Sequence, residues 1–178
     1  MEVTMFELAI REKPKLRFTK AIQDYYPDSF ANCFGCGRNN SHGLHTKTHW
    51  DPESETGICR FKPKEYHCGY KVVFHGGLIS SVIECNSVAT AIAATYEAED
   101  LDPENDHVFY VLGSINARFI RPIPIDSEVF VQAQVIRLEE KKAVCEVSVI
   151  ANETQCSKAE TVVIRVPNRL ILSNFIDQ

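Results

Sequence analysis

The hydrophobic positions of the chain follow two patterns, which predict two kinds of element. In the second half, apolar residues alternate with polar ones, as Val129, Val131 and Ala133 do, and a period of two is typical of half-buried strands. Residues 78–95 are apolar on every side of a helical wheel, which predicts a helix surrounded by protein. The predicted strands are 47–50, 57–61, 107–122, 128–138, 143–152 and 156–166. We therefore expect an α+β fold with an antiparallel sheet wrapped around one long central helix.

Breaks in these patterns predict the connections and the domain organisation. Residues 15–26 have loosely helical spacing, which Pro27 ends. Segments rich in glycine, asparagine or charge predict loops at 32–45, 62–77 and 96–107 and a hairpin turn at 138–142. We divide the chain into an N-terminal arm (1–31), a domain (32–166) and a C-terminal tail (167–178).

Composition and charge narrow the class of protein. The 178 residues are 44% hydrophobic and 24% charged, which indicates a globular domain and excludes disordered and fibrous chains. With 19 Lys+Arg against 24 Asp+Glu, the net charge is -5, so we expect no nucleic-acid partner, since such proteins need a basic surface. A few local cations could still hold an anionic small ligand. The acidic segment 97–106 is a poor place for one.

The sequence also bears on the compartment. The first twenty residues carry charges and no uninterrupted apolar run, so we expect no secretory signal. Glu84 and Asn86 interrupt the apolar helix, which favours a buried helix over a membrane span. Seven cysteines, an odd number, then predict reduced thiols in a cytoplasmic protein without a membrane partner.

Glu84 is the first candidate for chemistry. It is the one carboxylate in the predicted helix 78–95. Burial raises the pKa of a carboxyl group, and such groups concentrate at functional sites. Alternatively, the helix has one solvent-exposed side, because Ser80, Ser87 and Ala91 share the side of Glu84 and are small.

His75, Gly76 and Gly77 lie at the start of the same helix. Two glycines leave room for backbone N–H groups to approach a ligand oxygen, helped by the positive end of the helix dipole. This is the arrangement of an oxyanion hole for a polarised carbonyl. The alternative is a tight loop-to-helix turn, although the presence of Glu84 along the same helix makes a site the more specific interpretation.

The cysteines offer a weaker candidate. Cys33 and Cys36 have the spacing of half a zinc site, which requires two further ligands. The available residues are Cys59, His67 and Cys68. A turn with two small buried thiols explains the pair without a metal, and we predict neither a metal nor a cofactor. Cys85 has no histidine at a supporting spacing, so we do not expect a thiol nucleophile.

Arg118 and Arg121 are candidates for holding an anion, because guanidinium groups suit phosphate. For either arginine alone, the pattern favours a solvated face of a strand. Taken alone, neither arginine defines a site.

Three segments together carry a family resemblance. They are CFGCGRNNSHGLH (33–45), VFHGGLISSVIECNSVATA (73–91) and GSINARFIRPIPIDSEVFVQAQV (113–135). In this order the sequence resembles the hotdog-fold acyl-CoA thioesterases, the group that includes phenylacetyl-CoA and 4-hydroxybenzoyl-CoA thioesterases. The resemblance covers about residues 32–166.

The resemblance implies a function and roles for the site residues. The reaction would be hydrolysis of an acyl-CoA to a free acid and CoA. The Gly76 N–H would polarise the thioester carbonyl, and Glu84, at the family's Asp position, would act as general base or nucleophile. His75 would shape the loop and contact the thioester, and Gly77 would complete the catalytic turn.

The resemblance also extends to binding and assembly. We expect Asn86, Ser87, Arg118 and Arg121 to contact the acyl-CoA substrate. The family fold implies a homodimer with sites at the interface, or a dimer of dimers, that is a homotetramer. Two other functions stay open: a non-catalytic acyl-CoA-binding protein, and a zinc-stabilised interaction module built on Cys33 and Cys36.

Overall fold

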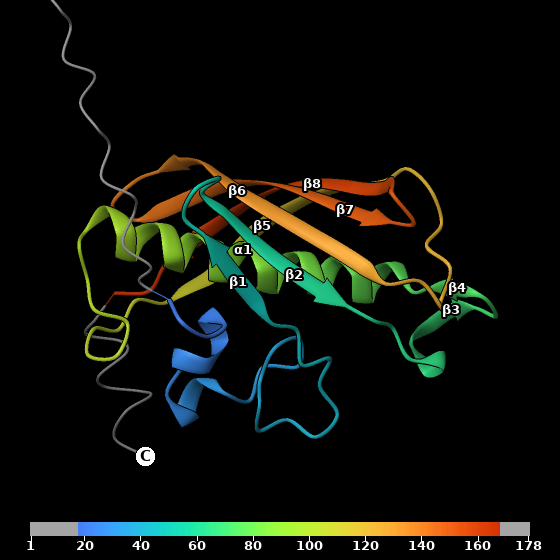
Figure 1. The fold of residues 1–178 in the computed structure, drawn as a ribbon, viewed down its shortest axis with the longest axis horizontal. Coiled ribbons are helices and arrows are strands. Elements are labelled where there is room, and N and C mark those ends of the chain that lie inside the picture. The colour runs from blue at the N-terminus through green and yellow to red at the C-terminus, as the bar shows by residue number, and fades with distance from the viewer. Residues whose placement is uncertain (1–17, 168–178) are drawn as a thin grey trace, which may run out of the picture.

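A six-stranded antiparallel sheet wraps around one long helix, α1 (Gly76–Ala98), in the computed structural model, which describes residues 18–167 (Figure 1). The strands lie in the order β1 (Thr48–Asp51), β2 (Thr56–Phe61), β6 (Val129–Leu138), β7 (Lys142–Ala151), β8 (Thr154–Arg165) and β5 (Tyr110–Phe119). Each predicted strand is present, and the predicted α+β arrangement is confirmed. The strand β5 forms one edge of this sheet.

Short elements occupy the segment 62–77, which we expected to be a loop. They are the 3-10 turn η3 (Glu65–His67) and a two-stranded sheet of β3 (Cys68–Tyr70) and β4 (Val73–Phe74), which precedes α1. Two further 3-10 turns, η1 (Ile22–Tyr25) and η2 (Asp28–Phe30), lie in the N-terminal segment.

The helix predicted for residues 15–26 is wrong in its described part. Only the single turn η1 forms there, because Ala21 and Tyr26 on either side of it have extended backbone with ψ of 147° and 135°. Residues 15–17 lie outside the described residues.

The central helix is longer than predicted at both ends. It begins at Gly76 because His75 caps it: the Nδ1 of His75 accepts the Gly77 N–H at 3.0 Å. It ends at Ala98, and the Glu99 N–H donates to the Thr95 carbonyl at 2.9 Å. By length and composition α1 could cross a membrane, but its most apolar window is 61% buried, as in the core helix of a globular domain.

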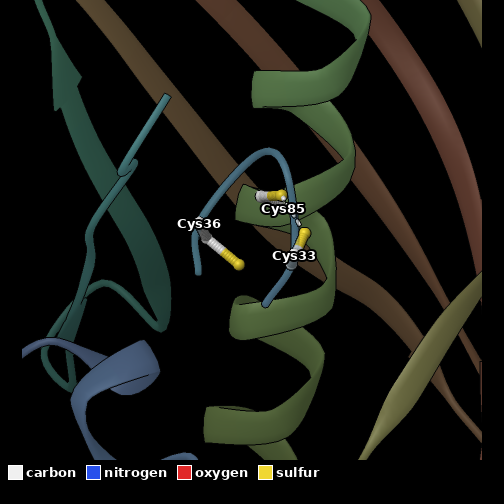
Figure 2. Close-up of side chains that lie close together, drawn as sticks. All are labelled: Cys33, Cys36 and Cys85. Carbon is white, nitrogen blue, oxygen red and sulfur yellow. Dashed lines mark hydrogen bonds between the residues drawn. The ribbon is translucent and has the colours of Figure 1, made fainter. Parts of the chain in front are cut away.

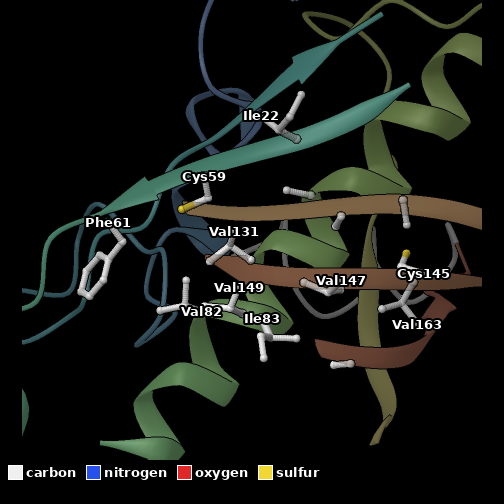
Figure 3. Packing of buried hydrophobic residues seen from close by; sticks show 14 of the residues in the cluster. Ile22, Cys59, Phe61, Val82, Ile83, Val131, Cys145, Val147, Val149 and Val163 are labelled. Carbon is white, nitrogen blue, oxygen red and sulfur yellow. The ribbon is translucent and has the colours of Figure 1, made fainter. Parts of the chain in front are cut away.

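The core lies between α1 and the concave face of the sheet. Figure 3 shows Val82 and Ile83 of the helix near strand residues of that face, among them Val131, Val149 and Val163. All five are at most 1% exposed. The all-round apolar pattern of residues 78–95 therefore reflects a helix surrounded by protein, as predicted.

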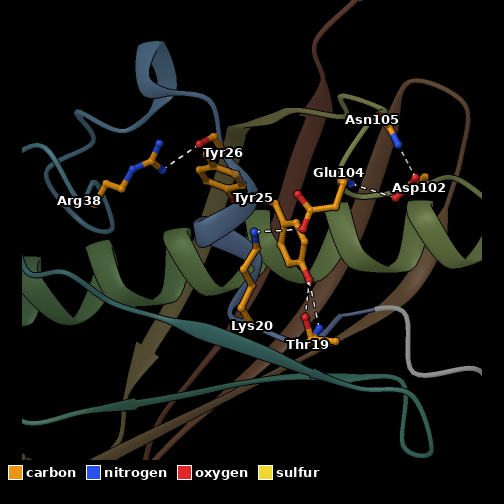
Figure 4. A network of polar contacts seen from close by, with 8 residues as sticks. All are labelled: Thr19, Lys20, Tyr25, Tyr26, Arg38, Asp102, Glu104 and Asn105. Atoms are coloured by element: carbon orange, nitrogen blue, oxygen red, sulfur yellow. Dashed lines mark hydrogen bonds and ion pairs between the residues drawn. The ribbon is translucent and has the colours of Figure 1, made fainter.

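Residues 18–31, which we assigned to an arm, pack against the core in the structure. Phe18 and Ile22 are buried, and the Phe18 ring meets Tyr96 of α1 edge-on with centroids 5.8 Å apart. Polar contacts add to this packing, including Lys20 with Glu104 at 3.2 Å (Figure 4). One of the acidic groups of segment 97–106 is thus paired with the N-terminal segment.

Candidate active site

A groove of about 560 Å³ opens at the N-terminal end of α1. Four segments line it: β3, β4, the start of α1, and the end of β5 with the stretch that follows. Its lining includes Tyr70, His75, Gly76, Ile79, Phe119 and Arg121. The predicted oxyanion residues therefore border a hollow large enough to hold part of a ligand.

Only one of the two glycines offers a free backbone donor. The Gly77 N–H is taken by the Nδ1 of His75, whereas the Gly76 N–H makes no hydrogen bond within residues 18–167. Gly76 is the first residue of α1, where an N–H has no partner within the helix. A Cβ at Gly76 would lie 3.7 Å from the Phe119 ring, so the donor is at the wall of the groove. His75 and Gly77 hold the turn that presents it.

Glu84 lies further along α1 and is half-buried. Burial raises the pKa of its carboxyl group above the ordinary value of 4.5, and the nearby Cys33 raises the pKa further. Among the described residues its carboxylate makes no hydrogen bond or ion pair that would offset this burial. The side chain is thus available to act as a base or nucleophile.

Within one chain, Glu84 and Gly76 cannot serve the same carbonyl. Eight residues separate them along α1, which corresponds to about 12 Å along the axis. An oxyanion donor must lie about 3 Å from the substrate oxygen, with the attacking group in contact with the carbon next to it. The residues that line the groove include Gly76 but not Glu84.

The two arginines are separated by the fold. Arg121 lines the groove beside His75 and Gly76. Arg118 lies opposite Lys158 in the β5–β8 pairing and lines a different hollow with Glu160, on the face of the sheet away from α1. Only Arg121 is placed to attract an anionic group to the groove.

Asn86 and Ser87 are in the interior rather than at the groove. Both are 0% exposed. The Asn86 amide donates to the carbonyls of Gly57 and Val131 at 3.2 and 3.3 Å and accepts from Thr48 Oγ1 at 2.9 Å. Asn86 therefore joins α1 to β1, β2 and β6, and its placement does not support contact with substrate.

The side chain of Ser87 is also hydrogen-bonded within the protein. Its hydroxyl donates to the Ile83 carbonyl at 2.8 Å, one turn back along α1. This placement does not support contact with substrate either.

Three cysteines come together close to Glu84, which the sequence did not reveal. The sulfur atoms of Cys33, Cys36 and Cys85 all lie within 4.8 Å of one another (Figure 2). The residues proposed to complete a zinc site, Cys59, His67 and Cys68, are not in this cluster. Cys85 is 49 positions from Cys36 in the sequence, so no spacing motif could have indicated it.

Hydrogen bonding within the cluster fixes where a negative charge is favoured. The Cys36 side chain, followed by Cys85, lowers the pKa of Cys33. The same hydrogen bond with Cys33 raises the pKa of Cys36, and Cys33 also raises that of Cys85. The cluster thus favours a thiolate on Cys33, with the other two thiols as donors.

Comparison with known proteins identifies the class. Residues 73–158 match the family model of the thioesterase superfamily. A search of curated proteins found no match. The matched segment runs from β4 into the first part of β8 and includes His75, Gly76 and Glu84.

Solved structures show the same fold. A thioesterase superfamily protein from Shewanella loihica is 25% identical, with 72% of this chain and 96% of that chain covered and a TM-score of 0.56. A thioesterase from Haemophilus influenzae is 17% identical (74% and 85% covered, TM-score 0.59). A Streptococcus mutans protein bound to acetyl-CoA is 11% identical (68% and 88% covered, TM-score 0.56).

The architecture, a sheet wrapped on one helix, is the hotdog fold. The match of residues 73–158 to the thioesterase superfamily agrees with the sequence resemblance. This match supports thioester hydrolysis as the general activity.

Proposed function

We propose that the protein hydrolyses an acyl-CoA thioester, using Gly76 of one chain and Glu84 of a second copy. The observation that carries the proposal is the unpaired Gly76 N–H at the wall of the groove, at the positive end of a long helix. A donor fixed in this way stabilises the negative charge that develops on a carbonyl oxygen during attack.

The proposed reaction needs one base or one nucleophile. Acting as a base, Glu84 removes a proton from water while the hydroxide adds to the thioester carbonyl. The tetrahedral intermediate then expels the CoA thiolate, which takes up the proton, and the free acid remains. Acting as a nucleophile, Glu84 forms an anhydride that water hydrolyses to the same products.

The chemistry of the groove is the reason for proposing a CoA thioester as the substrate. Phe119, Tyr70 and Ile79 provide apolar surface for an acyl or pantetheine chain, and Arg121 provides a cation for a phosphate. That the Streptococcus mutans neighbour is bound to acetyl-CoA is in keeping with such a ligand.

A homodimer, alone or within a dimer of dimers, would bring the separated groups together. The edge strand β5 carries the exposed apolar side chains of Val111 and Phe119, which are 54% and 52% exposed. Phe119 also lines the groove, so an interface along β5 would lie beside Gly76. We expect the protein to work in the cytoplasm, because all seven cysteines are free thiols.

The test is a thiol-release assay on a panel of acyl-CoA thioesters, with linear chains of several lengths and aryl groups. Glu84→Gln should lower kcat at least about a hundredfold, because the base or nucleophile is lost. Glu99→Gln is the matched control, since it alters a carboxylate at the other end of α1 and should retain activity.

Two substitutions at Gly76 isolate the N–H. Proline is tolerated at the first position of a helix but has no N–H, and His75 before it is already extended with ψ of 128°. Gly76→Pro should therefore lose about a hundredfold in kcat, whereas Gly76→Ala, which keeps the donor, should retain most of it. Unchanged turnover in Glu84→Gln would contradict the proposal. Binding of acyl-CoA without hydrolysis by the wild-type protein would indicate a binding protein instead.

A further inference from the structure

The three-cysteine cluster has the backbone geometry of a metal-binding turn. Cys33 and Cys36 lie in one tight turn, which the Gly37 N–H closes onto the Cys33 carbonyl at 2.8 Å. The turn brings both sulfur atoms next to Cys85 of α1 (Figure 2). Cysteines bind metal as thiolates, and two cysteines with this spacing are typical of a zinc site.

The sulfur spacing fits one ion. Tetrahedral zinc with Zn–S bonds of about 2.3 Å places its thiolates about 3.8 Å apart. Cys33 Sγ and Cys85 Sγ are 3.8 Å apart, and all three sulfurs lie within 4.8 Å of one another. Small side-chain rotations therefore suffice to bring the three atoms around a single centre.

The fold holds this geometry in place. A Cβ at Gly35 would lie 2.2 Å from the Cys85 sulfur, so the turn can approach α1 this closely only with glycine at that position. Thr46 binds the Gly35 carbonyl twice, through its N–H and its hydroxyl, both at 3.0 Å. The Leu44 N–H donates to the Phe34 carbonyl at 2.8 Å. Two ligands from a braced turn and one from a buried helix form a preorganised set.

We propose that Cys33, Cys36 and Cys85 bind one Zn²⁺ ion as thiolates. In residues 18–167 no other histidine, cysteine or carboxylate joins the set, so the fourth position is left to water or an external ligand on the exposed side, at Cys33. Thiolates select thiophilic ions such as Zn²⁺ over Mg²⁺ or Ca²⁺. Three thiolates and one Zn²⁺ give the site a net charge of -1.

This site departs from the sequence-based expectation of no metal, and it differs from the zinc site considered there. The third ligand comes from α1, directly after Glu84. Bound zinc would fix the 33–37 turn to the helix beside that carboxylate. The site lies apart from the groove at Gly76, so it stands whether or not the protein proves to be a thioesterase.

The test uses the full-length protein purified under reducing conditions in the presence of zinc. Elemental analysis should find one zinc per chain. After replacement of zinc by Co²⁺, the visible spectrum should show the d–d bands of tetrahedral cobalt, with thiolate-to-cobalt charge-transfer bands in the near ultraviolet. These bands report sulfur ligation directly and do not depend on activity.

Serine variants assign the ligands. Cys33→Ser, Cys36→Ser and Cys85→Ser should each weaken Co²⁺ binding at least about tenfold and reduce the charge-transfer bands. Cys68→Ser is the control for the exposed Cys33, and Cys145→Ser for the buried Cys85; both should bind as the wild type does.

Three results would overturn the proposal. The first is a folded wild-type protein, verified by circular dichroism, that contains no zinc and gives no charge-transfer bands with Co²⁺. The second is equal metal binding by the triple serine variant. The third is a Cys33–Cys85 disulfide that is present even after purification under reducing conditions. Such a bond would make the cluster a redox pair. None of these results bears on thioester hydrolysis.

Discussion

Asn86 is the residue on which three parts of the structure converge. Its amide bonds two strand carbonyls, and its oxygen accepts from Thr48, whose N–H and hydroxyl both bond the buried side chain of Gln23. Every member of this network is at most 2% exposed. Leaving one buried polar group unpaired costs about 1–3 kcal/mol, so the network is strongly stabilising only when complete.

We predict that Asn86→Ala lowers the free energy of unfolding by about 3 kcal/mol, because it removes the acceptor of the Thr48 hydroxyl and the amide donor to the carbonyls of Gly57 and Val131. Urea denaturation followed by circular dichroism measures the change. Asn116→Ala, on the exposed side of β5, should change stability by less than about 0.5 kcal/mol. Equal effects of the two substitutions would contradict the role of the network.

At the scale of single residues, the sequence shows which polar residues interrupt an apolar helix but not which way their side chains point. Glu84 and Asn86 are both polar interruptions of one apolar helix, yet Glu84 reaches the half-exposed side while Asn86 is fully buried beneath the sheet. Their positions on a wheel differ, but an all-round apolar helix does not indicate which side is covered less. For the same reason Cys85 could not be assigned to the cysteine cluster before the loop 33–37 was placed against the helix.

The close approach of β2 to α1 depends on one glycine. A Cβ at Gly57 would lie 2.0 Å from the Thr90 hydroxyl, which is itself fixed by a 2.6 Å hydrogen bond to the Asn86 carbonyl. The strand can pack against the helix here only where it has no side chain.

We predict that Gly57→Ala destabilises the protein by about 1–3 kcal/mol through overpacking. Thr90→Ala should relieve the clash, so the double variant should be more stable than the sum of the single effects implies. A double-mutant cycle from thermal or urea unfolding measures this coupling. Strict additivity would show that the helix and strand can move apart without cost.

A second link joins the end of α1 to β8. Arg165 binds both carboxylate oxygens of Glu99, and this hydrogen bonding lowers the pKa of Glu99 below its ordinary value of 4.5. A lowered pKa in the folded state means that the pair stabilises the protein above pH 4.5 and ceases to do so as the pH falls through the folded-state pKa. Because the Glu99 side chain is 42% exposed, solvent screening limits its contribution to about 0.5 kcal/mol.

The corresponding prediction is a difference that depends on pH. Glu99→Gln should be slightly less stable than the wild type near neutral pH, and this gap should close below pH 4.5, where the wild-type carboxylate becomes protonated. Thermal unfolding across the acidic range measures it. Arg165→Met should abolish the same pH dependence; a gap that persists in strong acid would assign the effect to packing.

Helices and strands were predicted well where the hydrophobic periodicity is strong. They were predicted less well where a capping residue decides where the element begins. The strands β6 and β7 follow their alternation almost to the residue, and the charged turn between them joins the pair as expected. The start of α1 was missed because its first two residues are glycines, whose poor helix propensity is overridden by the His75 cap. The short sheet of β3 and β4 carries no periodic pattern long enough to detect.

At the scale of the whole molecule, the proposed site should be shared between two chains. Glu84→Gln and Gly76→Pro homodimers would each be inactive. In a heterodimer of the two, one site would combine the intact Gly76 of one chain with the intact Glu84 of the other, and the second site would have both defects.

We therefore predict that co-expression of the two variants in equal amounts restores about a quarter of the wild-type sites, since half of the dimers are mixed and each has one intact site. Thiol release by the co-expressed mixture measures this recovery, and the tagged and purified heterodimer should have half of the wild-type activity. The two homodimers, Glu84→Gln and Gly76→Pro, each expressed alone, are the controls. If both groups acted from the same chain, each chain would carry a defect and no activity would return.

The order of strands in the sheet also bears on synthesis. The segment with Phe18 and Ile22 is made before α1, although it packs against Tyr96 of that helix, and α1 in turn packs against β6, β7 and β8, which are made after it. The edge strand β5 has only β8 as its neighbour, so it stays unpaired until nearly the whole domain has emerged. A chain without β8 would therefore expose the apolar surface of α1 together with an unpaired β5. Such surfaces promote aggregation, so β8 is the strand on which both the closure of the core and the protection of β5 depend.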